Sequence, residues 1–423
     1  MQQFKAFTNS FTAAAKEFAR DITSATNDGV STGRQYIING KSVVEERLLS
    51  EGGFGFVYLV RDQNGSMKYV VKKILCMDKE HFDMAMREVE LFEKLPVHAN
   101  LVKYYGHTIL KDARNREVII LLEYCPGGHL YDLMKRHPEG VPAPNIVRSL
   151  LDISKGLSVL HSMSPPVQHR DLKLENVLMS SSGNYVLLDF GSWSSDSPDL
   201  SQLAREDLMR FGDSVERYTT LMYRPPEMAD LYKGFKVSTK VDIWMLGCIL
   251  FTLINNRHPF QDASNLAIVN CKFSHDVDMC KKRPAKLVDL CYWLLAQNPG
   301  DRPDSDQLVA LLEKWDDEPL SLPGSVIERI EKDHKLYGVP TACLSRKKKS
   351  MTRKSAENTW DVAPQGISPK DASSPRWRAD FGDLLDINND CTKSEVIQPE
   401  QAIADYQRRR SSAPSVELPN LLD

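Results

Sequence analysis

The stretch His169-Arg170-Asp171-Leu172-Lys173-Leu174-Glu175-Asn176 is followed thirteen positions later by Asp189-Phe190-Gly191. Phosphoryl transfer from ATP needs a carboxylate that orients a hydroxyl, a cation near the moving phosphoryl group, and two oxygen ligands for magnesium. The two strings supply these groups in that order: Asp171, Lys173, Asn176 and Asp189. One short string alone is weak evidence, but the order and spacing of both together are specific.

The sequence around these strings predicts that both lie on loops. Residues 177–179 and 185–188 are short apolar runs separated by turn-forming residues, which predicts a hairpin with Asp189 at its far end. Upstream, apolar residues recur at helical spacing over residues 145–163 and predict a helix. Rigid elements therefore hold both loops, as positioning chemistry requires.

A glycine-rich segment precedes these strings: Ser50-Glu51-Gly52-Gly53-Phe54-Gly55-Phe56-Val57. It resembles the glycine-rich loop of protein kinases, G-x-G-x-x-G-x-V, with Ser50 in place of the first glycine. Glycines allow backbone N–H groups to approach phosphate closely, because no Cβ intervenes. The resemblance implies that Val57 lies over the adenine of ATP.

Residues 69–74 form a strand-like run that contains two lysines. Strand alternation sends Lys72 and Lys73 to opposite faces. Lys72 aligns with the V-A-I-K pattern of kinases, so it is predicted to reach the α and β phosphates. Its partner should be an acid on the next helix, where Glu88 and Glu90 are both candidates. We favour Glu88, because the residues that flank it match the kinase pattern.

Residues 118–122 form a continuous apolar run and predict a buried strand that ends at Leu122, at the back of the nucleotide pocket. The next residues, Glu123-Tyr124-Cys125, match a hinge whose backbone bonds adenine, and Pro126-Gly127-Gly128 ends the strand. The predicted ATP contacts are Ser50, Glu51, Gly52, Gly53, Phe54, Gly55, Val57, Lys72, Leu122, Glu123 and Cys125.

The stretch Tyr218-Thr219-Thr220-Leu221-Met222-Tyr223-Arg224-Pro225-Pro226-Glu227 resembles the end of a kinase activation segment, with Pro-Pro-Glu in place of A-P-E. The resemblance implies that the hydroxyl of Thr220 bridges Asp171 and Lys173, as in serine/threonine kinases. It also places Glu227 beside Arg302.

Asp242 opens a strongly apolar helix. Two compatible interpretations stand: the carboxylate anchors the backbone of the catalytic loop, or it caps the helix or lies in its first turn.

Arg170 precedes the predicted catalytic carboxylate, and in many kinases this arginine pairs with a phosphate on the activation segment. Carboxylates could replace that phosphate through charge-assisted hydrogen bonds. The acids available in the segment are Glu206, Asp207, Asp213 and Glu216. The alternative is that Arg170 awaits a phosphorylated Ser214 or Thr219. We expect the carboxylate arrangement, and therefore activity without phosphorylation.

The composition excludes several other classes of protein. A net charge of −3 gives no case for nucleic-acid binding, and the eight cysteines contain no C-x-x-C pair that would indicate a zinc site or a disulfide framework. Scattered unpaired cysteines indicate a reduced, cytoplasmic compartment. No apolar run approaches the roughly 20 residues of a membrane span.

Taken together, these motifs resemble the Numb-associated kinase family of serine/threonine kinases. Further residues that carry the resemblance are Gly33-Arg34-Gln35, Ser192, Asp230-Leu231-Tyr232 and His258-Pro259-Phe260. The family implies an α+β, two-lobed protein kinase fold: a small antiparallel β-sheet lobe with one regulatory helix, and a larger, mainly helical lobe. It implies ATP and Mg²⁺ as cofactors and clathrin-adaptor proteins as substrates. Some members carry an extra helix after the Pro-Pro-Glu position, expected here within residues 228–238.

Three regions are expected. Residues 1–32 form an N-terminal segment, residues 33–315 the kinase domain (small lobe about 43–124, large lobe about 125–315), and residues 316–423 a mostly disordered tail with one helical stretch near residues 324–336. The N-terminal segment has an apolar helical face, which fits either a membrane-surface helix or a helix docked on the kinase or a partner. That face consists of Phe4, Phe7, Phe11, Phe18 and Ile22.

The tail contains two leucine pairs, Leu384-Leu385 and Leu421-Leu422, each four residues after an acid. Both resemble acidic dileucine motifs that dock on clathrin adaptors, and the first also resembles a clathrin-box core. These motifs imply a kinase at clathrin-coated membranes. A basic run at residues 346–354 fits a nuclear-import signal, attraction to anionic membranes or plain solvation. A nuclear role is therefore an alternative, and a catalytically idle adaptor-binding scaffold is the third hypothesis.

Overall fold

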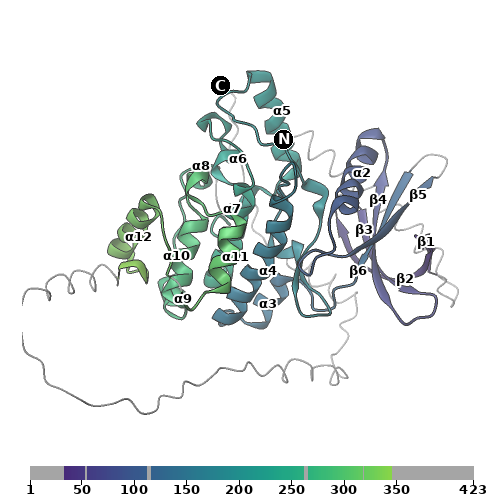
Figure 1. Cartoon of the computed structure of the whole chain (residues 1–423), viewed down its shortest axis with the longest axis horizontal. Helices are drawn as coiled ribbons and strands as arrows, with labels where there is room; N and C mark the ends of the chain where they lie inside the picture. Colours follow the sequence, from purple (N-terminus) through teal and green to yellow (C-terminus); the bar gives the residue numbers. More distant parts are fainter. Residues whose placement is uncertain (1–32, 53–54, 112–115, 262–264, 318, 345–423) are drawn as a thin grey trace, which may run out of the picture. The chain divides into compact units, whose positions relative to one another are not determined.

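The strands of the small lobe form one antiparallel sheet in the order β1-β2-β3-β4-β6-β5 (Figure 1). The structure, a computed structural model, describes residues 33–52, 55–111, 116–261, 265–317 and 319–344. The strands of this sheet are β1 (Gln35–Ile38), β2 (Lys41–Gly52), β3 (Gly55–Asp62), β4 (Lys68–Cys76), β5 (Tyr104–Lys111) and β6 (Arg116–Glu123).

The two faces of the sheet bury different residues, because successive side chains on a strand point to opposite sides. On one face, Tyr69 and Val71 of β4 belong to a small core with Tyr36 and Ile38 of β1. On the other face, Ile74 belongs to the main core shared with the rest of the domain. This alternation separates the two neighbouring lysines of β4.

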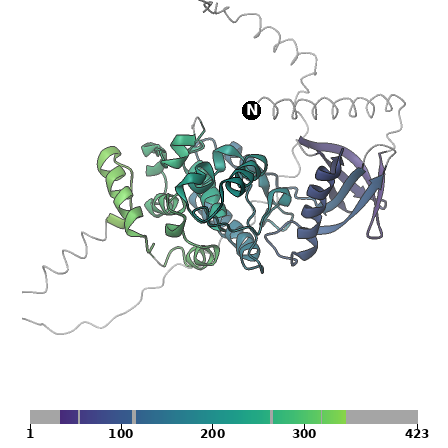
Figure 2. The same ribbon diagram turned by 90° about the horizontal axis from the view of Figure 1, so that it is seen from above.

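The helix α2 (Lys79–Lys94) packs on β4, β5 and β6 (Figures 1 and 2). Asp78 caps its start by accepting a 2.9 Å hydrogen bond from the backbone N–H of His81. Its buried side chains include Glu88 together with the apolar residues Ala85, Val89, Leu91 and Phe92. A carboxylate on an otherwise apolar buried face requires a partner in the core.

The large lobe is built around α7 (Lys240–Asn255), whose side chains from residue 241 to residue 255 are all buried. This helix packs against α4 (Ala143–His161), α9 (Val277–Lys281) and α10 (Ala285–Leu294). The lobe also contains α3 (Leu130–Arg136), α6 (Pro226–Ala229), α8 (Asn265–Val269) and α11 (Ser305–Glu313). The predicted hairpin is present as β7 (Val177–Met179) and β8 (Tyr185–Leu187), paired antiparallel. With the small lobe, this arrangement confirms the predicted two-lobed α+β fold (Figure 1).

The activation segment contains a helix that the sequence did not predict, α5 (Arg205–Tyr218), before Pro225-Pro226-Glu227. Within residues 228–238, where the resemblance implies an extra helix, the structure has the short 3-10 helix Leu231–Lys233. The helical stretch expected near residues 324–336 is present as α12 (Gly324–Tyr337), which buries Val326 and Ile330 in the main core. No helix in the described ranges is long and apolar enough to cross a membrane.

Candidate active site

Asp171, Lys173 and Thr220, which are predicted to lie around the substrate hydroxyl, form one cluster in the structure. The ammonium of Lys173 lies 2.6 Å from Asp171 Oδ2 and 3.3 Å from the hydroxyl of Thr220. That hydroxyl donates a 2.6 Å hydrogen bond to Asp171 Oδ1. The arrangement fixes the carboxylate from both sides, so that it can orient an incoming hydroxyl without reorganising.

Asn176 is tied to the same carboxylate. Its side-chain nitrogen donates to the backbone carbonyl of Asp171 at 2.8 Å and to Asp171 Oδ2 at 3.3 Å. Because the nitrogen is used in this way, the oxygen of Asn176 is the atom that it would offer to a cation.

Asp242 holds the backbone of the catalytic loop through hydrogen bonds. Its carboxylate oxygens accept hydrogen bonds from the backbone N–H groups of His169 (2.8 Å) and Arg170 (2.9 Å), and one of them also lies 2.9 Å from Nε2 of His161. Burial raises the pKa of Asp242, but His161, His169 and the backbone N–H of Arg170 together lower it further, so the pKa lies below its usual value. Asp242 also lies in the first turn of α7, so both sequence interpretations describe it.

Lys72 joins the small lobe to the magnesium loop. Its ammonium lies 2.7 and 2.8 Å from the two carboxylate oxygens of Glu88 and 2.7 Å from Asp189 Oδ1. The competing residues point elsewhere: Glu90 pairs with Lys94 on the surface of α2, and Lys73 lies on the opposite face of the sheet.

The charges of this cluster support one another. Burial opposes ionisation of Asp189, yet the neighbouring ammonium of Lys72 lowers the pKa of Asp189 to about 2. Desolvation favours neutral Lys72, but Asp189 and Glu88 raise its pKa above the ordinary value. Burial raises the pKa of Glu88 in spite of Lys72. Asp189 therefore remains an anion at neutral pH, as a magnesium ligand must.

Asp189 has a left-handed backbone, with φ of 65°. The residue after it, Phe190, is fully buried and lies in a row of rings that crosses both lobes. Ring centroids are 5.2 Å apart for Tyr104 and Phe92, 5.3 Å for Phe92 and Phe190, and 5.4 Å for Phe190 and His169. This packing holds Asp189 at Lys72, because Phe190 cannot leave the core without opening a cavity.

The described parts of the glycine-rich loop are the end of β2 and the start of β3, where Gly52 pairs with Gly55. A Cβ added to Gly55 would fall 1.9 Å from the carbonyl oxygen of Lys73, and its φ is 149°, so only glycine fits. Val57 of β3 lies opposite Ser50 of β2 and opposite Lys72 of β4, so the three residues are neighbours across the sheet. Gly53 and Phe54 lie outside the described residues.

The predicted hinge follows β6. Leu122 is buried, and the backbone N–H of Glu123 donates to the carbonyl of Lys103 at 2.9 Å. Cys125 is also buried; burial, aided by Glu123, raises the pKa of its thiol to about 12. The thiol is therefore neutral and unreactive at neutral pH.

These residues fit ATP and magnesium. Gly55, a position that only glycine fits, begins the strand whose Val57 lies opposite Lys72, which suits close approach of phosphate. The ionised Asp189, 40% exposed, together with the oxygen of Asn176 suits a hard cation. Magnesium, when bound, neutralises charge on the phosphates. Lys72 would hold the phosphates, and Asp171 would orient the accepting hydroxyl.

Glu227 and Arg302 form the predicted ion pair, with no exposed surface on either side chain. The guanidinium donates two parallel hydrogen bonds, at 2.6 and 2.8 Å, to the two carboxylate oxygens. It also donates to the backbone carbonyls of Ala296 and Lys240 at 2.8 and 3.0 Å. A fully bonded buried pair of this kind fixes the end of the activation segment to the large lobe.

The carboxylate partner expected for Arg170 is absent from the described residues. Arg170 is 3% exposed, its guanidinium carbon lies 5.7 Å from the ring centroid of Phe211, and its Nε and Nη2 atoms have no hydrogen-bond partner. The four candidate acids of α5 are all exposed. They lie on the solvent face because Leu208, Phe211 and Val215, at helical spacing, turn the other face toward a small core around Leu200.

Sequence reasoning missed two contributors, His161 and Trp193. His161 ends α4 and reaches Asp242 across 81 positions of sequence, a separation that no local pattern reports. Trp193 stands two positions after Gly191 and bonds α2; a bulky indole so close to the magnesium loop was the available signal.

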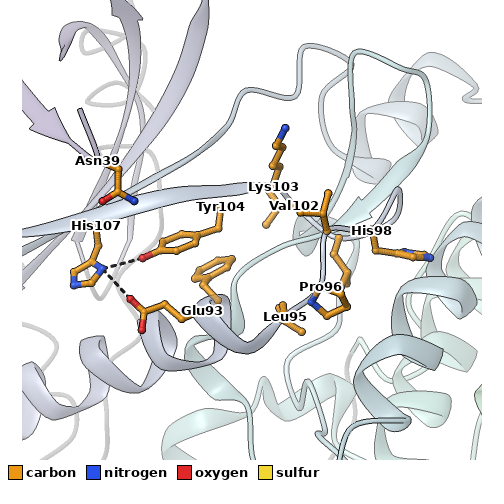
Figure 3. A pocket seen from close by; sticks show the side chains of 12 residues that line it. Asn39, Glu93, Leu95, Pro96, His98, Val102, Lys103, Tyr104 and His107 are labelled. Atoms are coloured by element: carbon orange, nitrogen blue, oxygen red, sulfur yellow. Dashed lines mark hydrogen bonds and ion pairs between the residues drawn. The ribbon is translucent and has the colours of Figure 1, made fainter. Parts of the chain in front are cut away.

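A separate cavity of about 400 Å³ lies where α2 runs into β5 (Figure 3). Its lining includes Phe92, Val97 and Tyr104, and His107 points toward both Tyr104 and Glu93. None of the residues predicted to bind ATP or magnesium lines it, so it is not part of the transfer site.

The comparisons with known proteins agree with this geometry. Over 330 residues the chain is 34% identical to a probable serine/threonine-protein kinase of Dictyostelium discoideum, a match that covers 74% of this chain and 40% of the relative. A second probable serine/threonine-protein kinase of that organism is 35% identical over 260 residues, or 60% and 23% of the two chains. Serine/threonine-protein kinase ppk30 of Schizosaccharomyces pombe is 32% identical over 298 residues, or 70% and 31%.

The chain thus spans less than half the length of each of these relatives. The family model for the protein kinase domain matches residues 43–312, which include both predicted loops, the glycine-rich turn and the Glu227–Arg302 pair. The chain therefore belongs to the protein kinase family, and its domain is that of an ATP-dependent protein serine/threonine kinase.

Proposed function

We propose that the whole chain works as a serine/threonine protein kinase on proteins of the clathrin coat, as a member of the Numb-associated branch of kinases. The observation that carries the serine/threonine assignment is the bridge from the Thr220 hydroxyl to Asp171 and Lys173, at 2.6 and 3.3 Å. The small bridging hydroxyl leaves Asp171 positioned for another aliphatic hydroxyl, that of a substrate Ser or Thr.

The catalytic roles are separable by experiment. Asp171→Ala removes the group that orients the hydroxyl, so phosphoryl transfer should fall at least 100-fold while ATP still binds. Asp189→Ala should instead lose magnesium-dependent ATP binding, because its carboxylate is the predicted cation ligand. Transfer to a protein substrate and ATP-induced thermal stabilisation are measured for both. Transfer by Asp171→Ala at the wild-type rate would refute the role of Asp171.

The acceptor is tested on a peptide array that offers Ser, Thr and Tyr in matched sequences. We expect phosphate on Ser and Thr. An array labelled mainly on Tyr would overturn the assignment.

The coat assignment rests on the sequence resemblance and on the two leucine pairs of the tail, Leu384-Leu385 and Leu421-Leu422, which lie outside the described residues. The best single substrate is a Thr in the medium chain of a clathrin adaptor. Purified adaptor complex should therefore be phosphorylated by the wild type and not by Asp171→Ala. Changing all four leucines to alanine should abolish adaptor pull-down and leave peptide phosphorylation intact.

Two other outcomes would redirect this proposal. Nuclear accumulation that depends on the basic run at residues 346–354, with no adaptor phosphorylation, would favour a nuclear kinase. A wild-type protein that binds the adaptor but shows no kinase activity would favour a scaffold. The Lys72–Glu88 pair is an argument against the scaffold. Burying a carboxylate is costly, and a protein without catalysis would not need one at that position.

A further inference from the structure

Trp193 and Arg87 join the activation segment to α2 by reciprocal contacts. The indole Nε1–H donates a 2.9 Å hydrogen bond to the backbone carbonyl of Arg87. The guanidinium of Arg87 donates back to the carbonyl of Trp193 at 3.3 Å and lies 5.4 Å from the centroid of the indole ring. A cation over an aromatic face adds to the two hydrogen bonds.

These contacts fall beside the catalytic ion pair. Arg87 directly precedes Glu88, which bonds Lys72, and Trp193 lies three residues after Phe190, whose backbone N–H bonds Glu88. A shift of α2 away from the large lobe would therefore break the Trp193–Arg87 contacts and the Lys72–Glu88 pair together.

The C-terminal end of α5 reaches the same side of α2. Arg217 pairs with Glu80, and the hydroxyl of Tyr218 lies 3.1 Å from the sulfur of Met84. Positions 80, 84 and 87 follow i, i+4, i+7 spacing and so lie on one face of the helix. The activation segment thus contacts α2 at two separate places, one from each end of the segment.

The two contacts differ in strength. Arg217 and Glu80 are 48% and 62% exposed, and exposed ion pairs contribute little because water and salt screen them. The Trp193–Arg87 hydrogen bond is exposed as well, but Trp193 is partly buried, packs against the main core and adds apolar contact and a cation over its ring. Trp193 is therefore the more important of the two contacts.

We propose that Trp193 is a positioning residue for phosphoryl transfer: it holds α2 where Glu88 can pair with Lys72. Formation of the ion pair and docking of the activation segment are then one event. The inference rests on the kinase activity proposed above, but on none of its substrates.

The test is a double-mutant cycle between Trp193→Ala and Glu88→Gln, with transfer to a generic protein substrate as the readout. Trp193→Ala alone should lower kcat/KM about tenfold, the factor given by about 1.4 kcal/mol of lost contact energy. If Trp193 acts through Glu88, Trp193→Ala should cost less than about twofold more in the Glu88→Gln background. Trp193→Phe, which keeps the ring but loses the N–H donor, should fall between wild type and Trp193→Ala.

Matched controls come from α5 itself. Arg217→Ala removes the contact with α2, whereas Arg210→Ala removes a same-helix pair with Asp207. We expect a loss below about threefold for the first and no change for the second.

Arg87→Ala, at an exposed position, provides a second test if Trp193→Ala fails to fold. Hydrogen exchange should show faster exchange over residues 84–91 in Trp193→Ala and Arg87→Ala, and wild-type exchange in Arg210→Ala.

The outcomes separate the two claims. An inactive wild type would refute the proposed function. An active wild type in which Trp193→Ala has no effect, or has the same fold effect with and without Glu88→Gln, would refute the role of Trp193 alone.

Discussion

Asp242 Oδ1 accepts a 2.9 Å hydrogen bond from the backbone N–H of Arg170, a residue whose φ is 67°. A left-handed backbone costs a non-glycine residue roughly 1–2 kcal/mol, so this loop needs a compensating interaction. The other oxygen of Asp242 provides one by accepting from His169 at 2.8 Å. The loop that carries Asp171 is thus shaped by a carboxylate in the large-lobe core.

Replacing Asp242 by Asn should disorder that loop. An amide has one acceptor oxygen, and its NH₂ group would face a backbone N–H donor. We expect the free energy of unfolding to fall by about 1–3 kcal/mol and kcat to fall at least tenfold, with KM for ATP changed much less. Chemical denaturation and steady-state kinetics measure the three quantities.

The control is Asp278→Asn. Asp278 also lies in the first turn of a helix, but its side chain is 88% exposed and pairs only locally with Lys281. It should leave both stability and activity near wild type. Equal effects from the two variants would show that the loop does not depend on Asp242.

Arg302→Ala should destabilise the large lobe. The substitution leaves Glu227 as a buried charge without its partner, which costs about 3–5 kcal/mol. Arg302→Lys should recover only part of this loss, because an ammonium cannot make the two parallel bonds that the guanidinium makes. Thermal and denaturant unfolding measure the effect. A melting temperature within a degree of wild type for Arg302→Ala would contradict it.

Lys72 and Lys73 are neighbours in sequence that should fail in different ways when each is changed to Met. Lys72→Met removes the cation next to Asp189 and Glu88, so transfer should fall at least 100-fold in a folded protein. Lys73 is 1% exposed, lies 3.5 Å from Glu45 and sits 4.7 Å over the ring of Tyr58. Lys73→Met should therefore lower the free energy of unfolding by about 1–3 kcal/mol and keep most activity per folded molecule.

The two variants are compared in the same preparation, with kcat normalised to the folded fraction. Exchanged phenotypes, with Lys73→Met inactive and Lys72→Met merely unstable, would show that the strand register assigned to β4 is wrong.

Local periodicity predicted much of this site. The period of two along β4 separated Lys72 from Lys73. The apolar stripe of α2 left both Glu88 and Glu90 as candidates, and the match of the flanking residues to the kinase pattern selected Glu88, which the structure buries. The β7–β8 hairpin followed from turn residues between two short apolar runs. These features depend on a few neighbouring residues, which is why one sequence suffices.

That Arg170 has no carboxylate partner among the described residues could not be foreseen in this way. Acids were available in α5, but which face of α5 points inward depends on the distant core of Leu200, Val215, Met228, Val237 and Val241. The same is true of His161, which lies far from Asp242 in sequence. Contacts set by tertiary packing leave no periodic trace in the residues that make them.

Buried His275 should make the large lobe sensitive to acid. Its ring lies 4.8 Å from Phe251 and 5.0 Å from Tyr292 between centroids, and its Nε2 has no hydrogen-bond partner in the described structure. Burial, with the positive charges of Arg329 and Arg257, lowers the pKa of His275 to about 3. The neutral ring is thus the form that the folded protein accepts.

The sign of the pH effect follows from proton binding. In the unfolded chain His275 would titrate near about 6.5, so below that pH the unfolded state binds a proton that the folded state refuses. Stability from this residue is complete above pH about 6.5 and declines as the pH falls toward about 3. From pH 7 to pH 5 the loss should be about 2 kcal/mol.

His275→Gln cannot take up the proton, so its free energy of unfolding should fall by about 2 kcal/mol less than that of the wild type over the same range. Denaturant unfolding at pH 7, 6 and 5 measures both curves. A variant that is merely less stable would give a curve parallel to the wild type, and parallel curves would show that His275 does not cause the acid sensitivity.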